Sequence, residues 1–291
     1  MASGAISIAS GDMATESSGE SGAVKIASGN ANAGASGAVI VSTGSSVQDS
    51  SSNIQFQTGD AQGSTGDISV KAGNSATAEG GTVLLQSGAS DTSISGSVNI
   101  QSASSPESGA IDITSGAASD GSSGKITVTS GDAIASSGAI NLVVGSASGG
   151  PGGDISITAG FSQQQLGGSI SLQSGGSSGG ASGEVKMTSA DSSAGASGDF
   201  LMKSGDASAG SSGLVSISTG SAASDASGGI TLKAGKGIES AGGITLEAGH
   251  ANGENVIGGH VSISAGSSLG ASSGLGGLLT LSAGKATVAT G

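Results

Sequence analysis

The chain has 291 residues, of which 58 are glycine and only three are aromatic, and its formal net charge is −13. It has no cysteine, which excludes disulfides, thiolate metal sites and cysteine nucleophiles. Its eight basic residues, all lysine, face 21 acidic ones, a balance that disfavours nucleic acid and anionic membranes as partners. The sequence contains no run of eighteen apolar residues, so it predicts no segment that inserts into a membrane.

A unit of about fifteen residues recurs from end to end, and the segment 198–212 (GDFLMKSGDASAGSS) is one copy of it. In each copy, two large apolar residues lie two positions apart, a small residue and a glycine follow, and a return rich in Ala, Ser and Gly leads to the next copy. The first large apolar residue falls, in chain order, at Ile6, Val24, Val39, Ile54, Ile68, Val83, Val98, Ile111, Ile126, Ile140, Ile155, Ile170, Val185, Phe200, Val215, Ile230, Ile244, Val261 and Leu279. Such a period indicates a repeat architecture rather than a flexible linker.

The irregular returns lie mainly toward the two ends of the chain. The first return is long and contains the segment 12–20, whereas the return between Val98 and Ile111 is short and contains Pro106. From Ile126 to Ile244 the spacing is the most uniform. The repeats therefore predict one continuous domain over residues 1–291.

Within each repeat, apolar and polar residues alternate with a period of two, which is the pattern of a β-strand. Phe200, Met202 and Ser204 share one face of such a strand, and Leu201 lies on the other. The return is too short for the helical crossover of a βαβ unit. We therefore predict an all-β fold, a flattened parallel β-solenoid (β-helix) of about nineteen 15-residue rungs with a thin aliphatic and small-residue core. A coil of thirty residues, with two sheets facing each other, remains the alternative.

The returns have a pattern of their own. The second residue after the closing glycine is usually Ala or Ser, as at Ala31, Ala207 and Ser177, and we expect these side chains to point inward. The glycines at the two ends of each return are expected to supply either the positive φ or the tight backbone that a sharp corner requires.

The frame SG-x-Φ-x-Φ-x-S-G, where Φ is a large apolar residue, covers the whole chain. It resembles the Gly/Ser/Ala-rich parallel β-solenoid repeats of surface adhesins and extracellular fibres, including repetitive secreted proteins of microalgae. The resemblance implies a structural protein, extracellular or at the cell surface, whose main partner is itself. Exposed ladder edges at Ile6 and near Val288 would allow end-to-end stacking into a filament, and the outward lysines facing acidic returns would allow lateral association.

A second class of function is a binding module that displays a flat Ser/Thr/Lys face to ice, mineral or polysaccharide. Similarity to insect antifreeze solenoids extends to this architecture, with outward pairs such as Thr127 and Thr129. Charged residues interrupt the face, and the candidate interaction residues on it are Lys71, Lys186, Lys203, Lys233, Thr127 and Thr129.

Calcium is the one cofactor that the sequence raises. The segment 149–154 (GGPGGD) matches the GGxGxD motif of calcium-binding β-rolls once, but those rolls repeat the motif every nine residues. Asp154 is thus a weak calcium candidate, as are Asp132 and Asp206, which follow closing glycines. Asp is also a common turn residue at such positions.

No arrangement of residues predicts catalysis. The two histidines, His250 and His260, have only scattered acidic neighbours in the sequence, and surface histidines are the simpler interpretation. No serine lies in a strand-to-helix nucleophile elbow, and no carboxylate pair stands out. We expect the protein not to be an enzyme and to need no cofactor.

Overall fold

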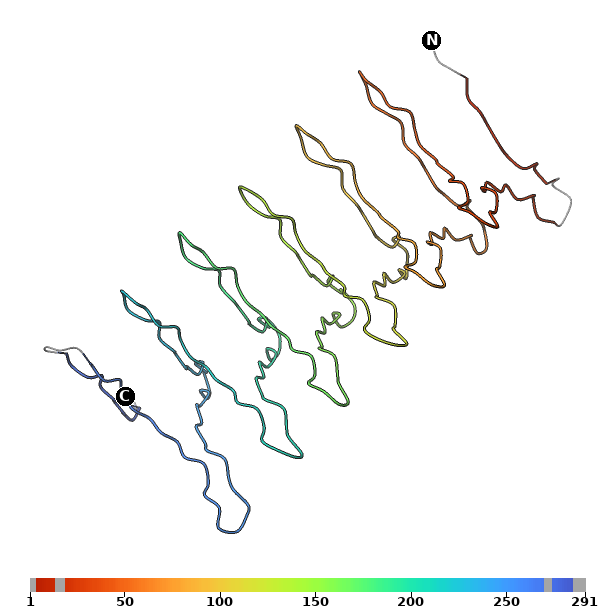
Figure 1. Cartoon of the computed structure of the whole chain (residues 1–291). Coiled ribbons are helices and arrows are strands. Elements are labelled where there is room, and N and C mark those ends of the chain that lie inside the picture. Colours follow the sequence, from red (N-terminus) through yellow and green to blue (C-terminus); the bar gives the residue numbers. More distant parts are fainter. Residues whose placement is uncertain (1–3, 14–18, 270–273, 285–291) are drawn as a thin grey trace. The chain divides into compact units, whose positions relative to one another are not determined.

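The computed structural model describes residues 4–13, 19–269 and 274–284. Over these residues the backbone forms neither helix nor strand, and its regular features are short turns and bends in the returns. Figure 1 accordingly shows a continuous tube without coils or arrows. None of the described residues belongs to a helix long and apolar enough to cross a membrane.

The predicted all-β parallel β-solenoid is therefore wrong, and so is its description as a β-helix. In a solenoid, backbone hydrogen bonds join each rung to the next. Here the described residues make six backbone–backbone hydrogen bonds, and each joins the two ends of a single return. The backbone polar groups are thus not used to stack repeats, and neither the fifteen-residue nor the thirty-residue coil forms.

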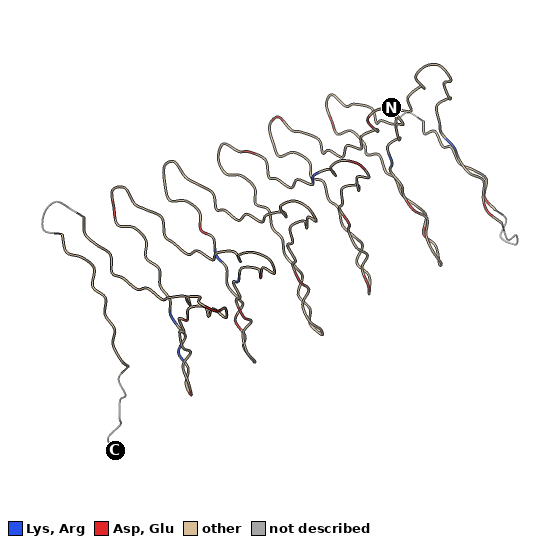
Figure 2. Cartoon of the chain, turned by 60° about the horizontal axis from the view of Figure 1, so that its bottom comes forward, with Lys and Arg blue, Asp and Glu red and all other residues tan. Residues whose placement is uncertain are grey.

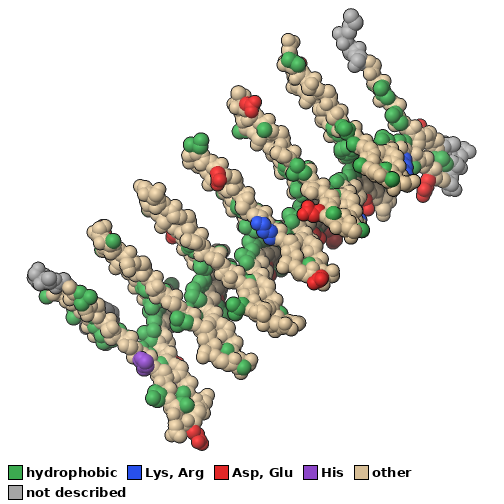
Figure 3. Space-filling view, viewed as in Figure 1, with side chains coloured by type: hydrophobic (Ala, Val, Ile, Leu, Met, Phe, Trp, Pro, Cys, Tyr) green, Lys and Arg blue, Asp and Glu red, His purple; other side chains and the backbone are tan. Residues whose placement is uncertain are grey.

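No core replaces the predicted one. None of the described residues is buried, whether apolar or polar. The chain exposes 28764 Å², whereas a compact protein of this length exposes about 11,000 Å². Figure 3 shows hydrophobic side chains on the visible surface at many places along the described chain. The structure is an extended, non-regular chain whose apolar residues remain accessible.

The alternation expected from the sequence is nevertheless present in the exposure of the side chains. The first apolar residue of each repeat is only about half exposed, from 45% at Ile54 to 58% at Phe200, with Ile6 as the exception. Apolar residues at the alternate positions are much more exposed, from 78% at Leu84 to 89% at Leu214. An extended backbone places successive side chains on opposite sides, which gives this period without a sheet.

By spatial proximity the chain divides into two units, Met1–Val143 and Val144–Gly291. Each unit contains the same type of repeat, with the same exposure pattern. The edge at Ile6 that was expected to stack has no ladder to extend, and Val288 lies outside the described residues.

Candidate interaction surface

The two ends of a return form its base, which we call the neck, and in six returns a backbone hydrogen bond joins these ends. The neck consists of the small residue before the closing glycine, the closing glycine, and the glycine that opens the next repeat. In the return that starts after Ala159, the Gly168 N–H donates to the carbonyl oxygen of Gly160, with an N···O distance of 2.8 Å. The same bond, at 2.8–2.9 Å, joins Gly81 to Gly73, Gly96 to Gly88, Gly183 to Gly175, Gly259 to Gly249 and Gly277 to Gly266.

The necks are the best covered part of the chain. Twelve of the described residues are half-buried, and all of them except Ser162 are the small residue of a neck. These neck residues are Ser10, Thr58, Ala72, Ser87, Ser102, Ser115, Ala159, Ser174, Ser204, Ala234 and Ala248. The small residue that recurs before the closing glycine therefore lies at the base of a local loop. It does not fill the interior of a solenoid rung, as the sequence predicted.

At four necks, those of Gly81, Gly153, Gly168 and Gly259, close approach favours glycine as the opening residue. A Cβ added to Gly168 would lie 3.0 Å from the Gly160 nitrogen and 3.2 Å from the Cβ of Ala159. Of the two reasons expected for glycine at the ends of a return, close backbone approach is confirmed at necks such as that of Gly168, whereas positive φ is not found at the end glycines that the structure describes. Positive φ occurs at Gly121, Gly210 and Asn255, all of them inside returns.

The serines in the returns do not form an inner face. In six returns with Ser at the second position after the closing residue, the Ser Oγ accepts a hydrogen bond from the backbone N–H three residues later. Six returns contain this bond, at 2.9–3.1 Å: Ser46 with Asp49, Ser75 with Ala78, Ser90 with Ser93, Ser162 with Gln165, Ser177 with Gly180 and Ser192 with Gly195. Ser and Asp commonly stabilise turns in this way. The inward orientation expected at Ala31, Ala207 and Ser177 is therefore wrong, since all three are exposed.

We predict that Gly168→Val opens its neck, because the new side chain has no room beside the backbone of Gly160. The Gly168 amide should lose its hydrogen bond, and its hydrogen-exchange protection by NMR should fall to that of an unstructured peptide. Gly160→Val is the matched control, since a Cβ there meets no atom within 4 Å. Equal loss of protection in both variants would contradict this account of the neck.

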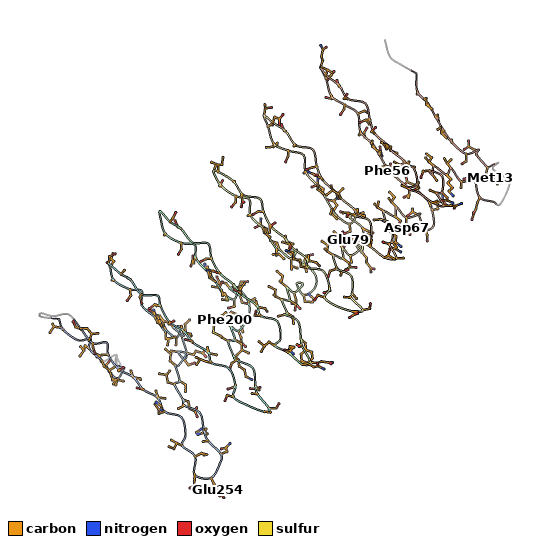
Figure 4. All side chains as sticks on the ribbon, viewed as in Figure 1. Met13, Phe56, Asp67, Glu79, Phe200 and Glu254 are labelled. Atoms are coloured by element: carbon orange, nitrogen blue, oxygen red, sulfur yellow. The ribbon has the colours of Figure 1, made fainter. Side chains whose placement is uncertain are left out.

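The main accessible apolar surface is the recurrent pair of large residues in each repeat. We call these the apolar pairs; Ile155 and Ile157 form one of them, and Phe200 and Met202 another. Both members are at least 45% exposed in every repeat. Figure 4 shows side chains distributed along the ribbon, among them those of Phe56 and Phe200. The apolar pairs therefore present a periodic surface that no other described part of the chain covers.

Charged groups are spread along both units (Figure 2). Of the expected interaction residues, Lys203 makes an ion pair, with its Nζ 3.0 Å from Oδ2 of Asp206, and both side chains are mostly exposed. An exposed pair of this kind contributes little to stability. Lys71, Lys186, Lys233, Thr127 and Thr129 are exposed as well, but the sheet face expected to align them is absent.

The three weak calcium candidates lie apart from other ligands of the right type. Asp132, Asp154 and Asp206 are exposed, and the described residues contain no group of three or more acidic or histidine side chains that could hold a metal ion. His250 and Glu247, close in sequence, do meet, with 3.2 Å between Nε2 and Oε1. No pocket is found in the part of the chain that the structure describes.

No protein-family model matches this chain, and neither a curated protein nor a solved structure is significantly similar to it.

Proposed function

We propose that this chain is a structural repeat protein that self-assembles into a fibre, outside the cell or at the cell surface. The observation that carries the proposal is the periodic exposure of the apolar pairs in a chain without a buried residue among those described. Covering a large apolar side chain is worth about 1.5–3 kcal/mol. A second copy offers the same surface with the same fifteen-residue period, so it can cover many apolar pairs at once.

The available area supports the same conclusion. A stable protein–protein interface buries about 1,200–2,000 Å², which is a small part of the 28764 Å² that this chain exposes. The extracellular or surface location rests on the resemblance of the Gly/Ser/Ala frame to adhesin and fibre repeats. Assembly by stacking of solenoid ends is not retained, because the described residues form no ladder between rungs. The alternative of a flat binding face needs a sheet that the described residues do not form.

The proposal predicts assembly that depends on concentration. Sedimentation velocity over a dilution series should show a small species at low concentration and large assemblies above a threshold. Electron microscopy above that threshold should show fibres. A single, concentration-independent species throughout the series would overturn the proposal.

A further inference from the structure

Two repeats differ from the others in the charges beside their apolar pair. In each, Asp immediately precedes the first apolar residue and Lys immediately follows the second, giving Asp-Φ-x-Φ-Lys. We call them the two Asp–Lys segments; they are 67–71 (DISVK) and 199–203 (DFLMK). One lies in each unit of the chain, and all ten of their residues are exposed.

The order of charges in these segments has a simple geometric consequence. When two identical extended segments pair antiparallel about their central residue, the first residue of one faces the fifth residue of the other. Asp67 then faces Lys71 of the second copy at both ends of the pair. A parallel, in-register pair would instead place Asp beside Asp and Lys beside Lys. The charge order thus favours the antiparallel pair, because opposite charges directly across from each other attract and like charges repel.

The apolar residues fit the same arrangement. Ile68 faces Val70 of the second copy, and in the other segment Phe200 faces Met202 of the second copy, a contact that suits the affinity of thioether sulfur for aromatic rings. The contact is isologous, with the same surface on both chains, as in a two-fold symmetric interface.

We propose that each Asp–Lys segment is a docking site for the same segment of a second copy, paired antiparallel. This inference rests on the proposed self-assembly and adds its orientation and its residues. The ion pair within one chain between Lys203 and Asp206 does not prevent it, since both side chains are exposed and free to exchange partners. Because each chain has two such segments, one copy can join two others, which is the minimum for a fibre.

Charge reversal tests the pairing. The variant D67K/D199K places Lys opposite Lys in both segments, and K71D/K203D places Asp opposite Asp. Each variant alone should need a roughly tenfold or higher concentration to self-associate. An equimolar mixture should recover to near the wild-type threshold, because every Lys then faces an Asp of the other variant. Recovery in the mixture should weaken as salt is raised.

Cross-linking tests the orientation, and the chain has no cysteine of its own to interfere. Ser69 lies at the centre of its segment, so antiparallel pairing places it beside Ser69 of the second copy, at a separation that a disulfide can span. Ser69→Cys should therefore oxidise rapidly to a disulfide dimer. Ser64→Cys is the control: antiparallel pairing carries position 64 toward position 74 of the second copy, whereas parallel in-register pairing keeps it beside itself.

The outcomes separate the two proposals. If the wild type assembles but both reversal variants assemble equally well, or if Ser64→Cys cross-links faster than Ser69→Cys, the antiparallel docking is wrong and the self-assembly stands. If the wild type stays monomeric at every concentration, both proposals fail together.

Discussion

Heated at a concentration below the assembly threshold, the isolated chain is expected to show no cooperative unfolding transition. Burial of apolar surface is the main favourable contribution to folding, and the described residues contain no buried side chain. Ordering the backbone of each residue costs roughly 1–2 kcal/mol at room temperature. The necks and serine-capped turns are local, so each should open independently of the others.

Differential scanning calorimetry measures this directly. A compact protein of this length would absorb about 200 kcal/mol in a single peak, and we expect no such peak below the threshold. Above it, a transition should appear whose midpoint rises with concentration, because association stabilises only the ordered form. A sharp endotherm at a midpoint independent of concentration would show that the single chain has a core, and would contradict the structure.

Replacing the apolar pairs of two neighbouring repeats should have the largest effect on assembly. In the variant I155S/I157S/I170S/L172S, four side chains that a second copy would cover become polar. Each loss removes about 1.5–3 kcal/mol of burial. We expect the assembly threshold to rise at least about a hundredfold, with the sedimentation of the dilute chain unchanged.

The matched control removes four apolar side chains that lie outside the pairs. The variant F161S/L166S/L214S/I238S changes residues that are 89–106% exposed and lie at the alternate position or in the returns. Its threshold should shift by only a few-fold. A shift as large as that of the first variant would mean that assembly responds to overall hydrophobicity and not to the apolar pairs.

Several features could be read from the sequence because they follow from local chemistry. The period of the repeats is plain in the order of residues. The alternation around Leu201 follows from an extended backbone, which places neighbouring side chains on opposite sides. Turns in the returns also follow from composition, since Ser and Asp bond to nearby backbone amides. Asp225 is one such turn residue, since its Oδ1 accepts from the Ala226 N–H at 2.7 Å.

The predictions that were wrong concern tertiary contacts. They are the hydrogen-bond partners of the backbone and the packing of the small side chains. An alternation of apolar and polar residues is compatible with a strand in a sheet and with an isolated extended segment. The two differ in their backbone hydrogen bonds to a neighbouring segment, and the alternation does not determine where that neighbour lies. Glycine at a corner fits positive φ and close approach equally well. Only the proximity of Gly168 to Gly160 decided between them.

The sequence by itself therefore determined the repeat, the apolar pairs, the small neck residues and the charge order of the Asp–Lys segments. These are properties of residue order within fifteen positions. The tertiary structure alone decided that six returns close through a hydrogen bond at their necks, that the repeats do not stack within the described residues, and that their apolar pairs stay accessible. The physical reason is that contacts between repeats depend on how segments distant in the sequence are positioned in space. A pattern within fifteen residues does not determine those positions.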